Sequence, residues 1–161
     1  PVFIKAMAVI AGPRQGQLRQ DYDYVHFEEN VRAAQAAYKE AGITNPFKEL
    51  SLAELHDCFT ITEMVTYEDL GFCPRGAAKE YIEAGAFELT GELPVQPDGG
   101  LKCFGHPIGA SGLRMLYEVY KQVQGKAQRP ERQLKNAQLG LTHNLGGDPR
   151  GCTTSVIIAG L

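Results

Sequence analysis

Three of the four histidines in this chain lie where proton-transfer chemistry could be built. His106 stands in the segment Gly105–Gly112 (GHPIGASG), which leads into an apolar helical pattern. Pro107 suits the first turn of a helix because its missing N–H would be unpaired there anyway. The glycines leave room for a ligand, and a helix N-terminus offers free N–H groups to a developing anion. This pattern favours a base at His106, although a histidine that only caps the helix is the simpler alternative.

The other two histidines of interest, His143 and His56, each close an expected strand. His143 is followed by Asn144–Gly147 (NLGG), where unpaired backbone N–H groups beside a titratable ring would suit an oxyanion hole and an acid–base partner. An ordinary β-turn is the alternative. Asp57 follows His56 and could orient its ring or only terminate the strand, and a satisfied buried histidine is the alternative there. We assign His26 no role beyond the surface.

The cysteines predict neither a disulfide framework nor a metal site. Four occur, widely separated and without a C-x-x-C pair: Cys58, Cys73, Cys103 and Cys152. Because the sequence shows no export signal, four widely separated cysteines predict a reducing, cytoplasmic environment. Cys58 lies near His56 and Cys103 near His106, but these contexts do not resemble the paired knuckles of structural zinc sites, so we expect no metal.

Length and composition indicate one globular domain over residues 1–161. Hydrophobic residues make up 43% and charged residues 22% of the 161 residues, which excludes intrinsic disorder. The net charge of −3, without a run of Lys or Arg, argues against a nucleic-acid or anionic-membrane partner. No apolar stretch approaches the roughly 20 residues of a membrane-spanning helix.

Hydrophobic periodicity places these residues on a series of strands and helices. Thr60 and Glu63 fit a capping box at the start of one helix, and Arg14–Asp23 is expected to be a loop. The expected elements are a strand over Val2–Ala11, a helix over Phe27–Ala41, a strand over Leu52–His56, helices over Thr60–Leu70 and Ala77–Ala84, a turn-rich strand or crossing over Gly91–Gly100, a helix over Ile108–Val123, and strands over Gln138–His143 and Cys152–Ala159 that a glycine-rich corner joins.

This order predicts an α/β layered fold, a five-stranded mixed sheet with helices on both faces. The expected helix over Ile108–Val123 is apolar on most sides, with Arg114, Glu118 and Lys121 as a narrow polar stripe. A helix of that kind is normally covered on most sides. We therefore expect another layer to cover it, and an uncovered apolar face when the chain is alone.

Taken together, the three histidine segments resemble the C-terminal half of a thiolase. The resemblance runs from Val2 to the end and is strongest over Gly99–Gly112, which is similar to the family's GHP motif. The segments His56–Phe59 (HDCF) and His143–Gly147 (HNLGG) resemble the sterol carrier protein-type branch, which includes acetyl-CoA acetyltransferases. In that resemblance His56 takes the place of an asparagine, and His143 the place of a cysteine, of better-known thiolases.

The resemblance implies Claisen condensation, or its reverse, thiolysis of a 3-oxoacyl-CoA, through a cysteine thioester. His106 would be the base that activates the cysteine, and His143 would move a proton to or from the CoA sulfur or the acetyl carbon. His56 would hold a water in one oxyanion hole, and a backbone N–H near Leu145 or Gly146 would serve the other. The residues expected to line the substrate are Gly105, Pro107, Gly109 and Ser111. The CoA thioester is substrate, and no further cofactor is implied.

None of the four cysteines lies in a context like that of the family's nucleophile. We therefore expect a C-terminal half that is inactive alone, binds CoA and acyl-CoA with an N-terminal half, and forms a homo-oligomer. Two alternatives remain open: a thiolase-fold aldol-type lyase acting on a β-hydroxyacyl-CoA, and a non-catalytic CoA-ester-binding or assembly subunit. A nucleophilic cysteine in the partner half would favour the enzyme.

Overall fold

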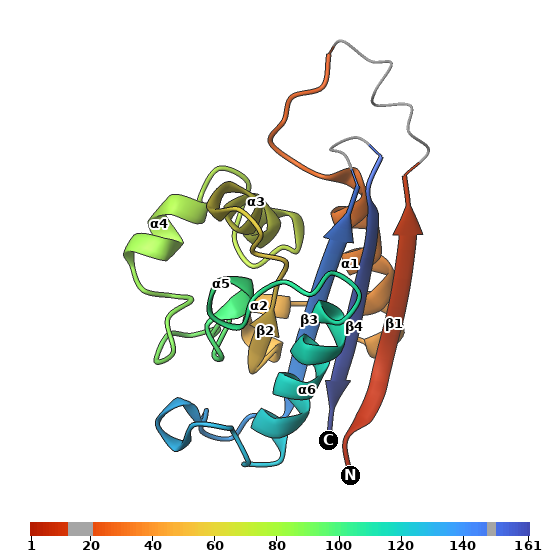
Figure 1. The fold of residues 1–161 in the computed structure, drawn as a ribbon. Coiled ribbons are helices and arrows are strands. Elements are labelled where there is room, and N and C mark those ends of the chain that lie inside the picture. Colours follow the sequence, from red (N-terminus) through yellow and green to blue (C-terminus); the bar gives the residue numbers. More distant parts are fainter. Residues whose placement is uncertain (13–20, 148–150) are drawn as a thin grey trace.

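A mixed sheet forms the centre of the structure, a computed structural model that describes residues 1–12, 21–147 and 151–161 (Figure 1). In this part of the chain the sheet has four strands in the order β1-β4-β3-β2. β4 is antiparallel to β1 and β3, whereas β2 is parallel to β3. The strands are β1 (Phe3–Ala11), β2 (Leu52–Glu54), β3 (Leu139–Gly146) and β4 (Thr153–Gly160). The expected α/β class is confirmed.

The expected fifth strand is not part of this sheet as described. Val95 makes a single isolated bridge to Ala53 at the β2 edge. Pro94 and Pro97 flank this bridge, and proline has no N–H to donate to a ladder. The turn-rich segment therefore crosses the edge of the sheet without extending it.

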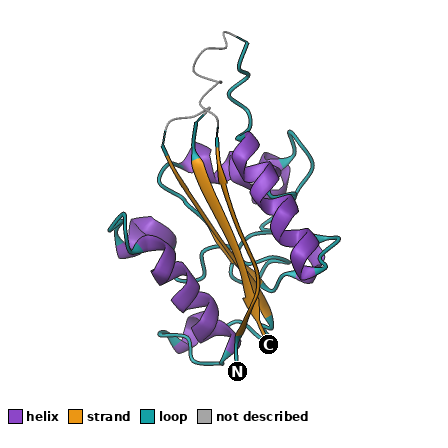
Figure 2. Cartoon of the chain, turned by 90° about the vertical axis from the view of Figure 1, so that its right-hand side faces the viewer, coloured by secondary structure: helices purple, strands orange, loops and turns teal. Residues whose placement is uncertain are grey.

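Helices cover both faces of the sheet, as expected (Figure 2). α1 packs on β1 and β4, and α6 packs on β2, β3 and β4 from the opposite side. The helix bounds are α1 (Glu28–Ala41), α2 (Pro46–Glu49), α3 (Thr60–Asp69), α4 (Ala78–Glu83), α5 (Gly100–Phe104) and α6 (Ser111–Val123). No helix among the described residues is long and apolar enough to cross a lipid bilayer.

Two apolar cores hold these layers together. The larger lies on the α1 side of the sheet, where Ala33, Ala34 and Ala37 of α1 are at most 1% exposed. These small side chains let α1 approach the sheet closely, because little volume separates the helix from the strands. The smaller core lies under α6 and contains Leu52, Val119, Val123, Leu134, Ala137 and Ala159.

The N-terminus of α3 differs from the expected capping box. α3 begins at Thr60, but the N-cap residue is Phe59 and makes no side-chain capping bond. Glu63 instead accepts a hydrogen bond from the Tyr67 hydroxyl at 2.7 Å. Residues four apart lie on one face of a helix, so Tyr67 reaches the Glu63 carboxylate from the next turn.

α6 turns apolar side chains toward solvent and polar side chains inward. Leu113 and Tyr117 are 70% and 57% exposed, whereas Met115 is buried against the sheet. Arg114 and Glu118, two residues of the expected polar stripe, lie largely buried beneath the helix. The expectation of an uncovered apolar face on this helix is therefore confirmed.

The same face of the sheet is also uncovered along β1. Met7 and Val9 are 63% and 62% exposed, while Ala6 and Ala8 point into the larger core beneath α1. Successive side chains of a strand point to opposite faces, so Met7 and Val9 lie on the face that carries α6. Exposed apolar side chains therefore lie on both β1 and α6 on this face of the sheet, and we refer to them as the apolar surface of β1 and α6.

The expected loop over Arg14–Asp23 falls mostly outside the described residues. The same holds for part of the glycine-rich corner expected between the last two strands, because residues 148–150 are not described.

Candidate active site

Two histidines from distant parts of the sequence touch each other. The ring centroids of His56 and His106 are 4.9 Å apart, with an angle of 78° between the ring planes. His56 lies just after β2 and is 7% exposed, whereas His106 lies on the exposed segment between α5 and α6. The structure therefore brings two of the three expected site histidines together, one buried and one open to solvent.

The protonation of His56 is set by its surroundings. Burial lowers its pKa, the neighbouring His106 lowers it further, and a hydrogen bond with the Asn144 side chain acts in the opposite direction. Its Nδ1 atom is buried and has no hydrogen-bond partner among the described residues. These surroundings therefore favour the neutral ring of His56, with Nδ1 unpaired in the described part of the chain.

Ser111 holds the His106 ring. The Ser111 Oγ atom lies 2.7 Å from His106 Nδ1 and donates a longer hydrogen bond, at 3.4 Å, to the Pro107 carbonyl. Ser111 is 1% exposed, so its hydroxyl, at the first residue of α6, orients the ring of His106, which precedes the helix. The expectation that Ser111 lines the substrate stays a prediction; in this structure its hydroxyl contacts His106.

The glycines around His106 fall into two groups. A side chain built at Gly105 or Gly109 would meet no atom within 4 Å, which leaves the space outside the loop open. Pro107 is exposed beside them. At Gly112, in contrast, an added Cβ would lie 3.1 Å from Asn144 Nδ2. The absence of a side chain at Gly112 thus lets Asn144 approach the start of α6.

β3 extends past the point where the sequence predicted that it would end. His143 and Asn144 pair with Val156 and Ser155 of β4, and the strand continues to Gly146. β2 pairs with β3 only as far as Thr142. Beyond Thr142 one edge of β3 has no strand partner among the described residues, so alternate backbone N–H groups near Leu145 and Gly146 face that edge.

His143 lies behind this site, not at its surface. Its side chain is 0% exposed, and its Nε2 atom lies 3.0 Å from Asn30 Oδ1. Burial, with a further contribution from His56, lowers the pKa of His143 to about 3. The structure therefore places His143 near His56, fully buried and neutral, without an atom open to a substrate.

Asn144 is the residue that the sequence analysis missed. Its side chain lies between the His56 ring and the backbone of Gly112. Its neighbour His143 points to the opposite side of β3, toward Asn30 of α1. The alternation of strand side chains could have identified Asn144, but only once the buried face of β3 was known.

Asp57 positions the segment that carries His106. The Asp57 Oδ1 atom accepts a hydrogen bond from the Leu101 N–H at 2.9 Å, and Asp98 Oδ1 accepts one from Gly100 at 2.8 Å. Both carboxylates therefore bind free N–H groups at the start of α5. Gly100 has a φ of +69° and lies directly against the Asp57 carboxylate, so a side chain would not fit there.

Arg114 anchors the same segment from beneath α6. Its guanidinium pairs with Glu54 Oε2 at 3.2 Å and with the Asp98 carboxylate. Burial raises the pKa of Glu54, and the charge of Arg114 opposes that shift. Arg114 also lies 5.3 Å from the centroid of the Phe104 ring. One side chain therefore joins β2, α6 and the turn that precedes α5.

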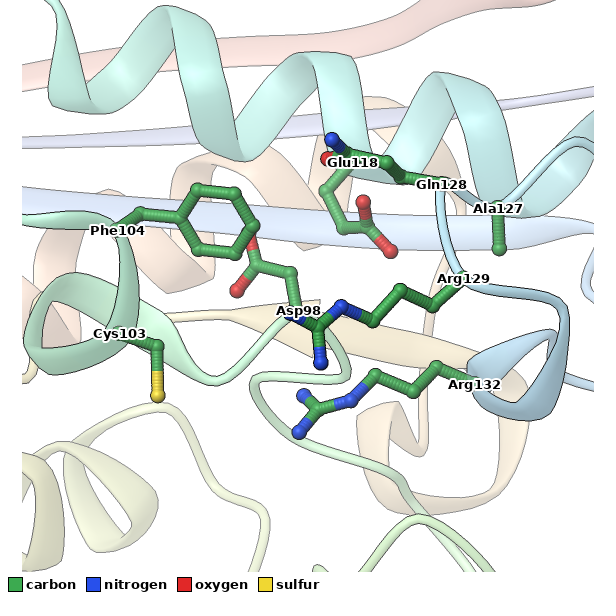
Figure 3. Close-up of a pocket in the computed structure, with 8 residues that line it drawn as sticks. All are labelled: Asp98, Cys103, Phe104, Glu118, Ala127, Gln128, Arg129 and Arg132. Carbon is green, nitrogen blue, oxygen red and sulfur yellow. The ribbon is translucent and has the colours of Figure 1, made fainter.

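A separate cavity of about 210 Å³ lies on the other side of α5 (Figure 3). Its lining residues are Asp98, Cys103, Phe104, Glu118, Ala127, Gln128, Arg129 and Arg132. In Figure 3, Arg129 and Arg132 extend across it toward Asp98 and Cys103. Cys103 thus lines this cavity, which contains none of the three histidines.

Comparison with known proteins identifies the family. The model of the family described as thiolase C-terminal domain-like matches residues 12–159. This chain belongs to that family. It is 40% identical over 147 residues to an acetyl-CoA acetyltransferase of Methanothermobacter thermautotrophicus, covering 91% of this chain and 37% of that protein. It is 34% identical over 148 residues to human sterol carrier protein 2, covering 88% of this chain and 26% of that protein.

A solved structure supports the same fold. The chain resembles one in the structure named Ltp2-ChsH2(DUF35) aldolase, with a TM-score of 0.79 and 28% sequence identity. The match covers 99% of this chain and 39% of that chain. The sequence thus spans well under half the length of the proteins that it matches.

Proposed function

We propose that this chain is the C-terminal half of a thiolase-type acyl-CoA acyltransferase. The observation that carries the proposal is the contact between His56 and His106 at the N-terminus of α6, in a chain of the thiolase C-terminal family. The reaction would be Claisen condensation or the reverse thiolysis of a 3-oxoacyl-CoA. An N-terminal half would supply the cysteine that takes the acyl group as a thioester.

In this proposal His106 acts as the base. It is exposed, its ring orientation is fixed by Ser111, and the space outside Gly105 and Gly109 is open to a substrate or a partner. In this proposal His106 takes the proton of the cysteine thiol, and its protonated ring then donates to a thioester oxygen. The segment Gly105–Gly109, including Pro107, borders the substrate.

His56 and the end of β3 would bind the second oxygen. The buried, neutral ring of His56 and the Asn144 amide both lie at the start of α6 and can hold a water or an oxyanion there. A backbone N–H near Leu145 or Gly146 supplies another donor in this proposal. Because its ring is fully buried, His143 contributes through its neighbour His56 without contacting the substrate.

The apolar surface on β1 and α6 is where we place the N-terminal half. Leu113, Tyr117, Met7 and Val9 are each more than half exposed on this face. Extensive exposed apolar surface usually marks an interface. Homo-oligomer formation and a cytoplasmic location are further parts of this proposal.

One observation favours a second candidate, an aldol-type lyase on the same fold. The similar solved structure is named an aldolase. That reaction would cleave a β-hydroxyacyl-CoA without transfer of an acyl group to a cysteine. The two activities are separable by substrate, because only thiolysis consumes free CoA.

The test uses the complete protein, with its nucleophile-bearing half. We expect consumption of CoA with a 3-oxoacyl-CoA and no cleavage of a β-hydroxyacyl-CoA. His106→Ala should lower turnover by about 10²-fold or more, the usual effect of removing a general base. His26→Ala is the matched control, because His26 pairs with Asp23 away from this site, and it should keep full activity. Full activity in His106→Ala, or cleavage of only the β-hydroxyacyl substrate, would overturn the proposal.

A further inference from the structure

A buried side chain of α1 contacts His143 from the side opposite the candidate active site. Asn30 is 0% exposed, and its Oδ1 atom accepts a hydrogen bond from the Thr154 hydroxyl at 2.9 Å. The same oxygen lies 3.0 Å from His143 Nε2. The amide nitrogen of Asn30 donates to Asp69 Oδ2 at 3.1 Å. Asn30 therefore connects the C-terminal turn of α3 to the middle of β3.

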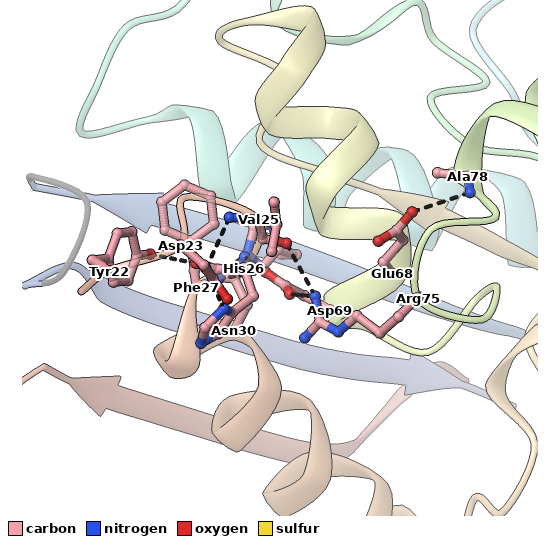
Figure 4. Close-up of polar contacts among 11 residues, drawn as sticks. Tyr22, Asp23, Val25, His26, Phe27, Asn30, Glu68, Asp69, Arg75 and Ala78 are labelled. Atoms are coloured by element: carbon pink, nitrogen blue, oxygen red, sulfur yellow. Dashed lines mark hydrogen bonds and ion pairs between the residues drawn. The ribbon is translucent and has the colours of Figure 1, made fainter.

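Asp69 determines which way the Asn30 amide points (Figure 4). The carboxylate accepts hydrogen bonds from the Phe27 N–H at 2.9 Å and from Arg75 Nη1 at 2.6 Å. Burial raises the pKa of Asp69, while these donors and the charge of Arg75 oppose the shift. A carboxylate held by these donors is an acceptor, so Asn30 must turn its NH₂ toward Asp69 and its oxygen toward His143.

The orientation of Asn30 in turn decides which ring nitrogen of His143 carries hydrogen. A neutral imidazole has one N–H donor and one acceptor nitrogen. The Asn30 oxygen can only accept, so the hydrogen must lie on Nε2. The other nitrogen, Nδ1, is buried and has no hydrogen-bond partner in the part of the chain that the structure describes.

We propose that Asn30 and Asp69 are positioning residues that fix His143 as the Nε2–H tautomer and keep its Nδ1 atom as a proton acceptor. This chain of contacts runs from Arg75 at the surface, through Asp69 and Asn30, to His143. A buried acceptor without a partner is unfavourable, because it has lost its hydrogen bonds to water. Asn30 itself contacts all three of its polar neighbours, Asp69, His143 and Thr154.

The tautomer can be measured directly, without any assay of activity. With ¹⁵N-labelled histidine, long-range ¹H–¹⁵N correlation spectra separate the two tautomers of each ring. The 161-residue chain has only four histidines, and the spectrum of His143→Gln identifies the signals of His143. At pH 7 we expect the Nε2–H form alone for His143. A Nδ1–H form, or a mixture, would overturn the proposal.

Asp69→Asn tests the origin of the tautomer. This variant keeps the shape of the side chain but removes the obligatory acceptor, so the Asn30 amide is free to turn over and the Nδ1–H form should become detectable. Glu68→Gln is the matched control, since Glu68 lies next to Asp69 on α3 and binds the Ala78 N–H instead. The control should leave the His143 signals unchanged, and an unchanged spectrum in folded Asp69→Asn would refute the role of Asp69.

Asn30→Ala provides a second test should Asp69→Asn not fold. Removal of the acceptor at Nε2 should also make the Nδ1–H form detectable, and persistence of the Nε2–H form alone would refute the role of Asn30. The catalytic meaning of this network rests on the proposed function: in the complete protein, Asp69→Asn should lower kcat more than it changes KM. A protein without thiolase activity would leave the tautomer result standing, so the two proposals can fail separately.

Discussion

At the scale of single residues, the buried ring of His143 makes the stability of the chain depend on pH. Its pKa is lowered to about 3 in the folded chain, against 6.5 for a free ring. Below pH 6.5 the unfolded chain binds a proton that the folded chain does not. The contribution of His143 to stability is therefore complete above pH 6.5 and is lost as the pH falls toward 3.

His143→Gln should remove this dependence. Between pH 6 and 4 we expect the free energy of unfolding of the parent chain to fall, relative to that of the variant, by up to about 1.4 kcal/mol per pH unit. Urea unfolding of both chains across this range is the measurement. His26→Gln is the control, because its ring is partly exposed, and parallel curves for His143→Gln and the parent chain would contradict the prediction.

His143 and Asn144 also show where inference from the sequence stops at this scale. The types and order of the residues were sufficient to select the three histidine segments. They could not show which of two neighbouring residues faces the site, because that depends on which side of β3 packs against α1. The structure turns His143 toward Asn30 and Asn144 toward His56.

At the scale of the elements, the buried charges beneath α6 hold the His106 segment in place. Arg114 is paired with Glu54 and Asp98, whose side chains are 0% and 4% exposed. Removing one member of a buried ion pair leaves a charge without compensation, which typically costs about 3–5 kcal/mol. The Arg114 guanidinium therefore anchors the turn before α5 to β2 and α6, in addition to the hydrogen bond between Asp57 and Leu101.

Arg114→Met should consequently destabilise the chain by several kcal/mol, seen as a lower urea midpoint. Adding Glu54→Gln to Arg114→Met should recover part of the loss, because it neutralises one of the two abandoned carboxylates. Lys121→Met on the same helix is the control, since Lys121 lies over the exposed Tyr117 ring, and it should change stability little. Equal effects of the two single substitutions would show that the buried pairs do not anchor the helix.

The elements themselves were largely predictable from periodicity. The spacing of the apolar residues predicted a helix over Phe27–Ala41. In the structure α1 spans Glu28–Ala41, and Gly42 at its end has the left-handed conformation. The failures had local physical causes. Prolines reduced the expected fifth strand to one bridge, and Tyr67 competed for the Glu63 carboxylate that the capping box required.

At the scale of the whole molecule, the apolar surface of β1 and α6 should drive association. Introducing a charge there, as in Tyr117→Glu, should lower the mass of the isolated chain measured by light scattering, or weaken its binding to an N-terminal half. Gln35→Glu on the exposed side of α1 is the matched control. A chain that is monomeric at high concentration and binds no N-terminal half would contradict the assignment of this surface.

The side chains of His143 and Asn144 point to opposite sides of β3, and this limits which sequence changes the strand can accept. Both side chains are placed by one backbone whose side chains alternate with every residue. Inserting or deleting a single residue early in β3 would exchange their sides, carrying the imidazole into the site and the amide into the interior. A substitution in β3 therefore changes one side chain and keeps the others on their sides. An insertion or deletion of one residue exchanges the sides of all the residues that follow it.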